Sequence, residues 1–434
     1  MNDKLDKARK EINEIDKEMA ELFLRRMKAA KDVAEYKRDR GLAILDEARE
    51  KEVISKNSAF VKEDNLRDLY VSFLQGTMNL SKIYQGRLIN GSEDGCKGKI
   101  HINLGSHGYD IHLGRGMLDR AGELFNLDRR VLIVTDTGVP REYAERLGAQ
   151  CKEARIITVK CGEESKSFEL YKILCHEMLD FGMTRTDCAV AVGGGVVGDL
   201  TGLAASSYMR GIDFYNIPTT LLSQLDSSIG GKTAINLDGV KNIVGAFYQP
   251  CGVIIDPDVL NTLPQRQIAS GLAEAIKMSL TSDAELFELI SNDDVKENIE
   301  EIIYRSLMIK KQVVEADERE GGIRRILNFG HTLGHGIEAA EEINTLYHGE
   351  CVAIGMIPVS STEVREKLVA ILEKFGLPTK YNGDIEKALS FIKQDKKCDG
   401  NKISVVFVDE IGSYRIEKTD VESFCSLVRE EYKI

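Results

Sequence analysis

The first 40 residues contain no glycine and no proline, the two residue types that most often interrupt a helix. Apolar side chains recur there at helical spacing, at Ile12, Ile15, Met19 and Leu22, and charged residues fill the positions between them. Together the two features favour a helix over the whole segment. It predicts one long amphipathic helix over residues 6–38.

Two shorter helices are expected after it, over residues 47–55 and 63–88, because the first proline comes only at Pro140. A unit of three such helices, residues 1–90, is too thin to bury its own apolar faces well. We therefore expect this unit to dimerise. Residues 91–98 follow, and their glycines and short polar side chains predict a linker.

A different pattern begins after the linker. β-branched runs bounded by turn residues alternate with helical segments, and this alternation predicts a parallel sheet with crossover helices. We expect an α/β dinucleotide-binding domain over residues 99–265. Its clearest β-branched runs cover residues 99–104, 131–135, 155–159 and 188–192.

From about residue 265 the pattern is helical again, up to a late strand predicted over residues 402–408. The fold class predicted for the chain is therefore multidomain. An all-α three-helix N-terminal module precedes the α/β domain with its parallel sheet, and a mainly α-helical metal- and substrate-binding domain over residues 266–434 follows it. The helices predicted in this last domain cover residues 271–278, 283–291, 295–316 and 331–342.

The composition of the chain argues against several functional classes. The net charge of −12 argues against a chain that binds nucleic acid as a whole. No run of 18 apolar residues and no apolar leader are present, so neither a membrane span nor a secretory signal is predicted. The nine cysteines lack any Cys-x-x-Cys pair, as expected of reduced thiols. We expect a cytoplasmic protein without nucleic-acid or membrane partners.

A glycine-rich run, Gly-Gly-Gly-Val-Val-Gly-Asp over residues 193–199, follows directly on an apolar strand. Glycines let backbone N–H groups approach a diphosphate, and the next helix presents its N-terminus to the same group. The run therefore indicates a dinucleotide site. Its spacing differs from the usual G-x-G-x-x-G, and a tight strand-to-helix turn without a ligand has the same sequence.

A metal site is indicated further along the chain. His331, His335 and His348, three of only seven histidines, fall within 18 residues. His331 and His335 are four residues apart and share one helix face. Glu274 lies in another predicted helix, and a borderline ion such as zinc accepts both nitrogen and oxygen ligands. The alternative for each histidine is a hydrogen-bonded polar side chain without a metal.

Five basic residues, Lys232, Lys241, Lys277, Lys310 and Arg324, lie among Gly, Asn and Asp rather than in runs of charge. Several cations near a metal indicate a substrate that carries phosphate and carboxylate groups. Each of these residues, taken singly, also fits a solvated surface position.

These motifs combine into a resemblance that covers about residues 99–434. The chain resembles 3-dehydroquinate synthase in the segments GGGVVGDLTG, MRG, IPTTLLSQLDSSIGGKTAIN, KNIVGAFYQP, LAEAIK, ADERE, LNFGHTLGH and YHGE, which occur in order. The resemblance implies an enzyme that uses NAD and zinc. It would convert 3-deoxy-D-arabino-heptulosonate 7-phosphate into 3-dehydroquinate and phosphate.

The resemblance also implies residue roles. Glu274, His331 and His348 would be the ligands of zinc, or of cobalt, and His335 would lie on the phosphate side of the substrate. Arg210 matches an arginine that reaches the substrate phosphate of the neighbouring subunit, which implies a homodimer or a larger homo-oligomer.

Longer sets of contacts follow from the same resemblance. NAD would be contacted by Asp136, Glu163, Lys166, Gly194, Gly195, Asp199, Thr219, Thr220, Lys241 and Thr262. The substrate would be contacted by Asp226, Lys232, Asn242, Lys277, Lys310, Arg324, Asn328 and Lys396. Lys397 stands beside Lys396 and fits that position equally. Gly138 departs from the family, in which many relatives carry Asn at this place in the nucleotide site.

The implied reaction explains why both groups are needed. NAD takes a hydride from the sugar ring and returns it, zinc polarises the hydroxyl concerned, phosphate leaves in between, and an aldol step closes the new ring. Because NAD is regenerated, the net reaction is that of a lyase.

The N-terminal unit carries a second resemblance, to the all-helical chorismate mutase family, over about residues 4–88. Its motifs are Arg-Lys-Glu-Ile-Asn-Glu-Ile-Asp over 9–16, Arg25-Arg26, Lys37, Asp-Glu-Ala-Arg-Glu over 46–50, and Ser81-x-x-x-Gln85. The resemblance implies rearrangement of chorismate to prephenate. The implied pocket is lined by Arg9, Arg26, Lys37, Asp46, Arg49, Glu50, Ser81 and Gln85.

The long predicted helix constrains how that pocket is built. Arg9 and Arg26 are 17 residues apart, which is roughly 25 Å along a helix that rises 1.5 Å per residue. The two side chains of one chain cannot grip the same small substrate. Arg9 is therefore expected to serve the site of the partner subunit in an interlocked dimer.

Together the resemblances predict a bifunctional enzyme of the shikimate pathway and of aromatic amino-acid biosynthesis. The alternatives for the larger part are a related sugar-phosphate cyclase and a polyol dehydrogenase of similar architecture. The alternative for the helical unit is a binding or regulatory module without catalysis. Because the two reactions are not consecutive, we hypothesise that the helical unit also reports chorismate or prephenate to the synthase.

Overall fold

The computed structural model describes residues 2–40, 47–62, eight single positions from 66 to 81, 98–320, 322–341, 345–394 and 402–432. The chain divides into two compact units, Met1–Lys99 and Ile100–Ile434, hereafter the first and the second unit. Each is described by itself. The predicted linker lies outside the described residues except for residue 98. The predicted division of the second unit at residue 265 stays a prediction.

The first unit is helical. It begins with α1, Asn2–Asp39, and α2, Glu47–Ser58. These helices confirm the two predicted over 6–38 and 47–55, with ends that differ by a few residues. The eight described positions between 66 and 81 are helical as well, and the remainder of the helix predicted over 63–88 lies outside the described residues.

The two halves of α1 are packed differently. In the C-terminal half, Ala30 and Ala34 are buried, and the Arg26 guanidinium donates to the carbonyl oxygen of Thr77 at 3.1 Å. In the N-terminal half, the apolar stripe is exposed, with Ile12 55% exposed. A continuous apolar stripe on a helix indicates that a further surface covers it.

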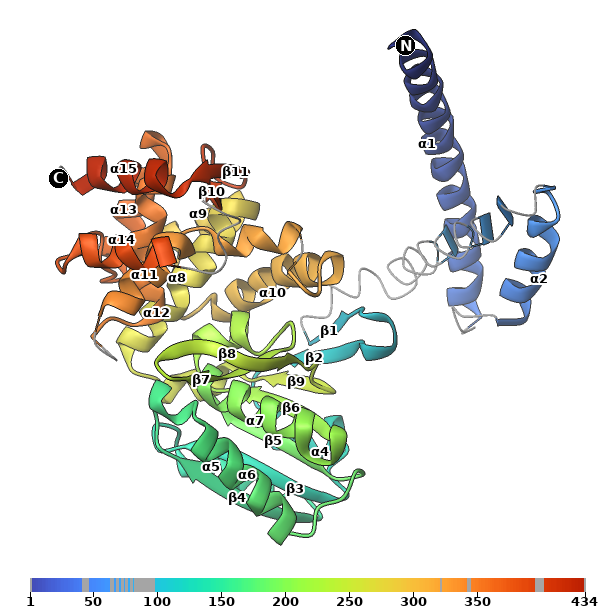
Figure 1. Ribbon diagram of the computed structural model, residues 1–434. Helices are drawn as coiled ribbons and strands as arrows, with labels where there is room; N and C mark the ends of the chain where they lie inside the picture. Colours follow the sequence, from blue (N-terminus) through green and yellow to red (C-terminus); the bar gives the residue numbers. More distant parts are fainter. Residues whose placement is uncertain are drawn as a thin grey trace. The chain divides into compact units, whose positions relative to one another are not determined.

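A seven-stranded sheet forms the centre of the second unit (Figure 1), with the strand order β1-β2-β9-β6-β5-β3-β4. Every pair from β2 to β4 along this order is parallel, which confirms the predicted parallel sheet. The strands are β1 Lys99–Ile102, β2 Tyr109–Leu113, β3 Arg130–Asp136, β4 Glu153–Val159, β5 Cys188–Gly193, β6 Asp213–Pro218 and β9 Gly252–Ile255.

Successive residues of a strand point to opposite faces of a sheet, and here helices pack against both faces. Val131 of β3 belongs to the core shared with α5, Arg141–Gly148. Its neighbour Leu132 belongs to the core shared with α6, Phe168–Asp180, and α7, Gly195–Ser207. The sheet is therefore buried on both sides, as a parallel sheet usually is.

The chain reverses its direction of travel across the sheet between β3 and β5. From β3 it moves outward to β4, and from β5 it moves the other way to β6. At such a point the loops at the carboxyl ends of the two strands diverge and leave a crevice where ligands bind. β3 ends at Asp136 and β5 runs into the glycines 193–195, so the predicted nucleotide turn lies at this crevice.

The rest of the second unit is mainly helical, and Figure 1 shows its helices, yellow to red, gathered beside the sheet. The four predicted helices are confirmed, although α8 is longer at both ends. Their buried residues join those of β1, β2 and β9 in one hydrophobic core. The helices are α8 Gln265–Ser282, α9 Ala284–Asn292, α10 Ile299–Ala316, α11 His331–Ala340, α12 His348–Met356, α13 Thr362–Lys374, α14 Ile385–Gln394 and α15 Val421–Tyr432.

A β-hairpin between sheet and helices was not predicted. β7, Lys232–Leu237, and β8, Val240–Phe247, pair antiparallel around Asp238 and Gly239, whose φ angles are 49° and 78°. Asp-Gly between two β-rich runs is the usual sequence of a two-residue hairpin turn. The signal is thus present in the chain, and the hairpin carries Lys232, Lys241 and Asn242 of the predicted site.

The late strand predicted over 402–408 is β10, Lys402–Phe407. It does not stand alone, because it pairs antiparallel with β11, Arg415–Asp420. The burial pattern explains why β11 escaped prediction. Five of its six residues are exposed, so it lacks the apolar alternation that marks a strand.

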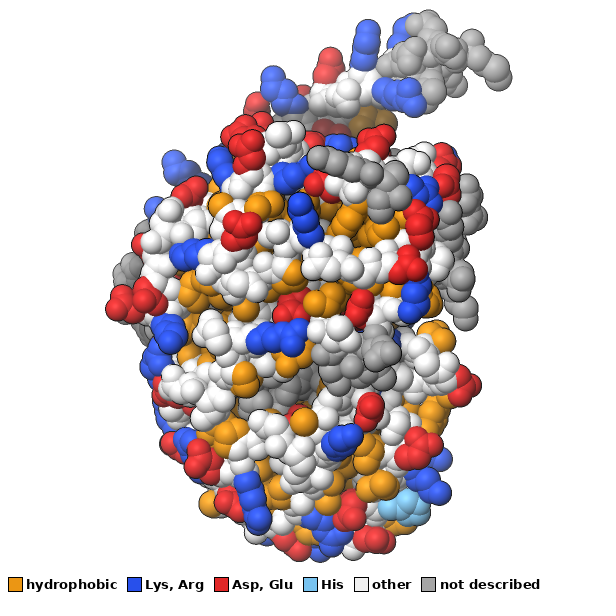
Figure 2. All heavy atoms as spheres, turned by 90° about the vertical axis from the view of Figure 1, so that its left-hand side faces the viewer, with side chains coloured by type: hydrophobic (Ala, Val, Ile, Leu, Met, Phe, Trp, Pro, Cys, Tyr) orange, Lys and Arg blue, Asp and Glu red, His pale blue; other side chains and the backbone are white. Residues whose placement is uncertain are grey.

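The surface of the protein carries charges of both signs. On the face shown in Figure 2, Lys and Arg side chains are interspersed with Asp and Glu. No helix in the described ranges is long and apolar enough to cross a membrane. The cysteines that the structure describes carry free thiols; they are Cys151, Cys161, Cys175, Cys188, Cys251, Cys351 and Cys425.

Candidate active site

Three helices bring the predicted metal ligands together. Glu274 lies in the middle of α8, whereas His331 and His348 are the first residues of α11 and α12. The Nε2 atoms of His331 and His348 lie 3.6 and 3.4 Å from Glu274 Oε1. One ligand atom from each residue lies within 4.8 Å of the others, which is close enough to surround one metal ion.

Glycines allow these helices to approach. A Cβ atom on Gly349, the second residue of α12, would lie 2.0 Å from the carbonyl oxygen of Ser270 in α8. A Cβ atom on Gly355 would lie 1.9 Å from the carbonyl oxygen of Gly330, at the start of α11. Both positions exclude any larger residue, because the opposing atoms belong to the backbone. The segments LNFGHTLGH and YHGE thus combine ligands with the close contacts that position them.

The ligand atoms are prepared for a metal ion. His331 Nδ1 lies 3.1 Å from the carbonyl oxygen of Phe329, which can only accept, so Nδ1 carries the proton and Nε2 keeps its lone pair. Glu274 is fully buried, and in the described part of the chain neither of its oxygens accepts a hydrogen bond of regular geometry. Its charge is met by an ion pair with Lys277. A divalent cation would satisfy this buried carboxylate.

The electrostatics of the metal-free site agree with this arrangement. Burial would raise the pKa of Glu274, but Lys277 and the two imidazoles hold that pKa well below its usual value. Burial, together with Lys277, lowers the pKa of His331 well below its usual value. A carboxylate and a neutral imidazole are the forms that bind metal ions. Burial would lower the pKa of His348, but Glu274 and Glu338 raise it to about 10, so metal binding there would release a proton.

His335 lies beside the triad. Its ring centroid is 5.1 Å from that of His331 and 6.0 Å from that of His348. It follows His331 by one helical turn, as the spacing in the sequence predicts. Its predicted role toward the substrate phosphate remains a prediction.

Three of the predicted cations are almost completely buried: Lys277, Lys310 and Arg324. The alternative of a solvated surface position is therefore wrong for these three, because a buried cation needs a partner. Lys310 donates to Asp226 Oδ1 at 2.6 Å, and burial lowers the pKa of Lys310 although Asp226 opposes the shift. Arg324 donates to the carbonyl oxygen of Gly230 at 3.2 Å.

Glu320 links two further predicted residues, although it was not itself predicted. It accepts a hydrogen bond from Asn328 Nδ2 at 3.2 Å and forms an ion pair with Lys232. The signal was available, because Glu320 is the last residue of the segment ADERE that carries part of the resemblance.

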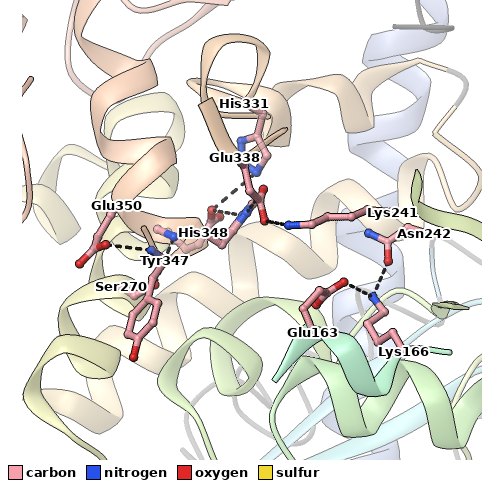
Figure 3. Close-up of polar contacts among 12 residues, drawn as sticks. Glu163, Lys166, Lys241, Asn242, Ser270, His331, Glu338, Tyr347, His348 and Glu350 are labelled. Carbon is pink, nitrogen blue, oxygen red and sulfur yellow. Dashed lines mark hydrogen bonds and ion pairs between the residues drawn. The ribbon is translucent and has the colours of Figure 1, made fainter. Parts of the chain in front are cut away.

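Glu338 is the second functional candidate that the sequence reasoning missed. Figure 3 shows it between His348 and Lys241, and its carboxylate lies 3.3 Å from His348 Nδ1 and 2.8 Å from Lys241 Nζ. It follows His331 by seven residues, which places both on one face of α11. That spacing could have revealed it. Lys241, predicted to contact NAD, is thus engaged on the metal side of the site.

The nucleotide turn has the features of an anion site. α7 begins at Gly195 directly after β5, and no side chain in the described ranges caps its N-terminus. Its first N–H groups are therefore available to a phosphate. A Cβ atom on Gly194 would lie 3.1 Å from Thr220 Cγ2, and Thr219 N donates to the carbonyl oxygen of Gly193 at 3.0 Å. The two threonines thus pack directly against the turn.

A buried lysine joins two other predicted nucleotide contacts to Asn242, which was predicted to contact the substrate (Figure 3 shows Lys166, Glu163 and Asn242). Lys166 donates to Asp199 Oδ2 at 2.6 Å, lies 3.8 Å from Glu163 Oε1 and contacts the amide oxygen of Asn242. Burial raises the pKa of Asp199 to about 6, although Lys166 opposes the shift. The structure thus brings four residues from three different segments into one polar cluster.

The end of β3 holds the other predicted nucleotide contacts. Asp136 Oδ1 accepts a hydrogen bond from Gly138 N at 2.7 Å. A Cβ atom on Gly138 would lie 3.1 Å from that oxygen and 3.3 Å from Cys161 Cβ. A larger side chain at Gly138 would require Asp136 or Cys161 to shift by a few tenths of an ångström. Thr262 is 3.0 Å from the hydroxyl of Tyr143, which follows in α5.

Arg210 lies apart from these clusters in a strained turn. Met209 and Arg210 have φ angles of 52° and 69°, which non-glycine residues rarely adopt. The Arg210 side chain is exposed and makes no ion pair with the described residues. Its predicted contact with the phosphate of a neighbouring subunit remains a prediction.

The predicted residues of the first unit are covered only in part. Arg26 contacts the hydroxyl of Ser81, Lys37 is half-buried, and Arg9 is exposed far along α1. Nothing is described of the other predicted residues' side chains: Asp46, Gln85 and, in the second unit, Lys396 lie outside the described residues, as do the side chains of Arg49 and Glu50.

Comparisons with known proteins settle the family. The 3-dehydroquinate synthase of Streptococcus sanguinis is 43% identical over 346 residues, which are 75% of this chain and 98% of that protein. The enzyme of Streptococcus mutans is 42% identical over 347 residues. The chain belongs to the 3-dehydroquinate synthase family. Family models described as 3-dehydroquinate synthase N-terminal and C-terminal match residues 156–270 and 271–398.

A third family model, chorismate mutase type II, matches residues 8–86. The chain is therefore a chorismate mutase domain fused to a 3-dehydroquinate synthase. This finding confirms the predicted fusion and both predicted enzyme classes.

Solved structures confirm the fold. A 2-deoxy-scyllo-inosose synthase complexed with carbaglucose-6-phosphate, NAD+ and Co2+ has a TM-score of 0.70 at 25% identity, over 76% of this chain and 99% of that one. The 2-epi-5-epi-valiolone synthase of Streptomyces hygroscopicus, with NAD+ and Zn2+ bound, has a TM-score of 0.67 at 26% identity, over the same shares. These sugar-phosphate cyclases are less similar than the streptococcal enzymes, so the alternative of a related cyclase is not favoured.

Proposed function

We propose that the second unit of this 3-dehydroquinate synthase binds a zinc ion at Glu274, His331 and His348, and NAD at the turn formed by residues 193–199. The observation that carries the proposal is Glu274, a fully buried carboxylate whose Oε1 atom lies 3.6 and 3.4 Å from the Nε2 atoms of His331 and His348. The buried acid, the two imidazoles and the open helix N-terminus all suit these two groups. When bound, NAD takes up and returns a hydride and the metal ion polarises substrate oxygens.

The side chains around the triad would bind the rest of the substrate. Lys277, Lys310 and Arg324 offer three buried positive charges, which suit a phosphate and a carboxylate because charge-assisted hydrogen bonds are strong away from water. The polyol dehydrogenase alternative needs no such set of cations. The cations would also stabilise the negative charge that develops as phosphate leaves.

Asp226, Glu320 and Asn328 would orient these cations and the substrate hydroxyls. Asp226 fixes the ammonium group of Lys310 at 2.6 Å, and Glu320 holds Lys232 next to Asn328. Groups held in this way do not have to reorganise when the substrate enters, and such pre-organisation lowers the barrier of the reaction.

The first unit would catalyse the rearrangement of chorismate to prephenate without a cofactor. Arg26 and Lys37, on one side of α1, would hold the two carboxylates and the ether oxygen of chorismate in a compact conformation. Arg9 would reach the site of a partner subunit. The exposed stripe of α1, which includes Leu22, would bury itself against that second copy.

The assembly and the location of the enzyme are part of the same proposal. We infer a homodimer or larger homo-oligomer, because both the stripe on α1 and the exposed Arg210 would then find a partner. Small-molecule substrates and reduced cysteines fit an enzyme of the cytoplasm.

The decisive test of the synthase is phosphate release from 3-deoxy-D-arabino-heptulosonate 7-phosphate. The full-length protein is supplied with zinc and a catalytic amount of NAD, and absorbance is monitored for NADH. Phosphate release without accumulation of NADH supports the proposal. Stoichiometric NADH would overturn it in favour of a dehydrogenase. Removal of the metal with a chelator should abolish the reaction, and added zinc should restore it.

A further inference from the structure

Glu338 occupies the position from which a metal ligand can be oriented. Its Oε2 atom lies 3.3 Å from Nδ1 of His348, while Nε2 of the same imidazole lies 3.4 Å from Glu274 Oε1. The two nitrogens of His348 therefore face two different carboxylates. An imidazole that donates its Nδ1 proton to a carboxylate is fixed in orientation, and its Nε2 becomes a better metal ligand.

Lys241 holds the other oxygen of Glu338. Its ammonium group lies 2.8 Å from Glu338 Oε1, so the carboxylate is clamped between a cation and an imidazole. Lys241 comes from the β7–β8 hairpin and Glu338 from α11, so the contact ties the hairpin to the metal site. The Lys241 side chain is 40% exposed, so solvent screens its ion pair with Glu338. We therefore expect Lys241 to affect metal binding less than Glu338, which is more buried.

A ligand role for Glu338 itself is less consistent with this geometry. His335, Glu338 and His348 also lie within 4.8 Å of one another, and could surround an ion on their own. An ion bound there through Nδ1 of His348 would replace the contact between that nitrogen and Glu338 Oε2. The triad with Glu274 leaves this contact in place, because Nε2 of His348 faces the buried carboxylate.

We propose that Glu338, held by Lys241, is a positioning residue that orients His348 toward the metal ion. The inference rests on the proposed zinc site. It adds to that site a residue that acts on the ion only through His348, and it assigns Lys241 a role toward the metal.

The test measures the zinc affinity of the full-length protein, without NAD, by competition with a chromophoric chelator. Glu338→Gln removes the charge but keeps the shape, and we expect its zinc Kd to rise about 10- to 100-fold. Lys241→Met should raise the Kd by less. The matched control is Glu341→Gln on the same turn of the chain, because Glu341 bonds to the Tyr381 hydroxyl at 2.6 Å instead of to His348.

Two further readouts separate orientation from general damage. The visible absorption spectrum of the cobalt-loaded protein should shift in Glu338→Gln and stay unchanged in Glu341→Gln, because it reports the geometry of the ligands. In the double variant, Lys241→Met should add nothing to the effect of Glu338→Gln, since Lys241 acts through Glu338. If Glu338→Gln fails to fold, Lys241→Met alone carries both measurements.

The outcomes distinguish this inference from the zinc site itself. His331→Ala is measured in parallel, and if it leaves the zinc Kd unchanged, the proposed metal site is wrong. If His331→Ala loses zinc but Glu338→Gln and Lys241→Met keep the wild-type Kd and cobalt spectrum, the role of Glu338 is wrong and the zinc site stands.

Discussion

Arg266 and Glu350 form a two-pronged ion pair that ties α12 to α8. Nε and Nη2 of Arg266 donate to the two carboxylate oxygens of Glu350 at 2.7 and 2.8 Å. Glu350 also accepts from the backbone N–H of Tyr347, the residue before His348. The helix that carries Glu274 thus holds the first turn of the helix that carries His348.

Breaking this pair should disturb the metal site from a distance. Arg266→Met leaves the buried Glu350 without its cation, at a cost of about 1–3 kcal/mol in folding stability. We expect a lower melting temperature and weaker zinc retention. Arg266→Lys keeps the charge but not the two-pronged geometry. Its melting temperature and zinc retention should lie between those of the wild type and Arg266→Met. Calorimetry and metal analysis after gel filtration measure both effects, and wild-type values for Arg266→Met would contradict the role.

A single methyl group at residue 349 should separate two helices. Gly349→Ala places a carbon 2.0 Å from the backbone of Ser270, so α12 must move and His348 with it. We expect loss of zinc binding even if the protein still folds. Gly148→Ala is the control, because its Cβ atom would meet other side chains only at ordinary distances of 3.6–3.7 Å. Equal zinc binding by the two variants would disprove the close-contact argument.

Stability should depend on pH through Asp199. Its pKa is raised to about 6 in the folded protein, so folding favours the protonated form. The stability that this preference provides is present at low pH and is lost as the pH rises through about 6. Asp199→Asn imitates the protonated form.

Relative to wild type, Asp199→Asn should therefore gain about 1.4 kcal/mol of stability between pH 5 and pH 7.5, because about one unit of the pKa shift falls in this window. Melting temperatures of the NAD-free proteins, compared at the two pH values, check this. A difference between variant and wild type that does not change with pH would show that Asp199 is ionised throughout.

The interlocked mutase site can be tested by mixing inactive subunits. Arg9→Ala and Arg26→Ala should each abolish prephenate formation, because every site lacks one arginine. After unfolding and refolding together, mixed dimers contain one site with both arginines, and about a quarter of the wild-type activity should return. Arg25→Ala, next to Arg26 but exposed, should stay active. No recovery on mixing would place both arginines in the same chain's site.

Much of the fold could be predicted from local patterns. The long helix α1 follows from the absence of helix-breaking residues, and β3 and β5 follow from β-branched runs that both faces of the sheet bury. β11 could not be predicted, because a pairing with β10 and not its own burial makes it a strand. The β7–β8 hairpin was predictable from Asp238-Gly239, because a two-residue turn of this kind commonly joins two β-rich runs.

The metal triad could be predicted from the sequence because its ligands lie in recognisable motifs. The partners of those ligands were harder to predict. Glu338 has a recognisable spacing from His331, but its contact with Lys241 joins residues 97 positions apart, and only the packing of the hairpin against α11 creates it. Arg266 and Glu350 are likewise brought together by the packing of two helices.

The backbone contacts of α11 and α12 also limit which ions the site can accept. At Gly330 and Gly355 the backbones of the two helices are in direct contact, with no side chain between them. A change of side-chain rotamer therefore cannot alter the distance between the helices. A bound metal ion must fit the distance between ligands that the helices set. Zinc and cobalt differ little in radius and can replace each other by small rotations of the imidazoles, whereas a large ion such as calcium would have to force the helices apart.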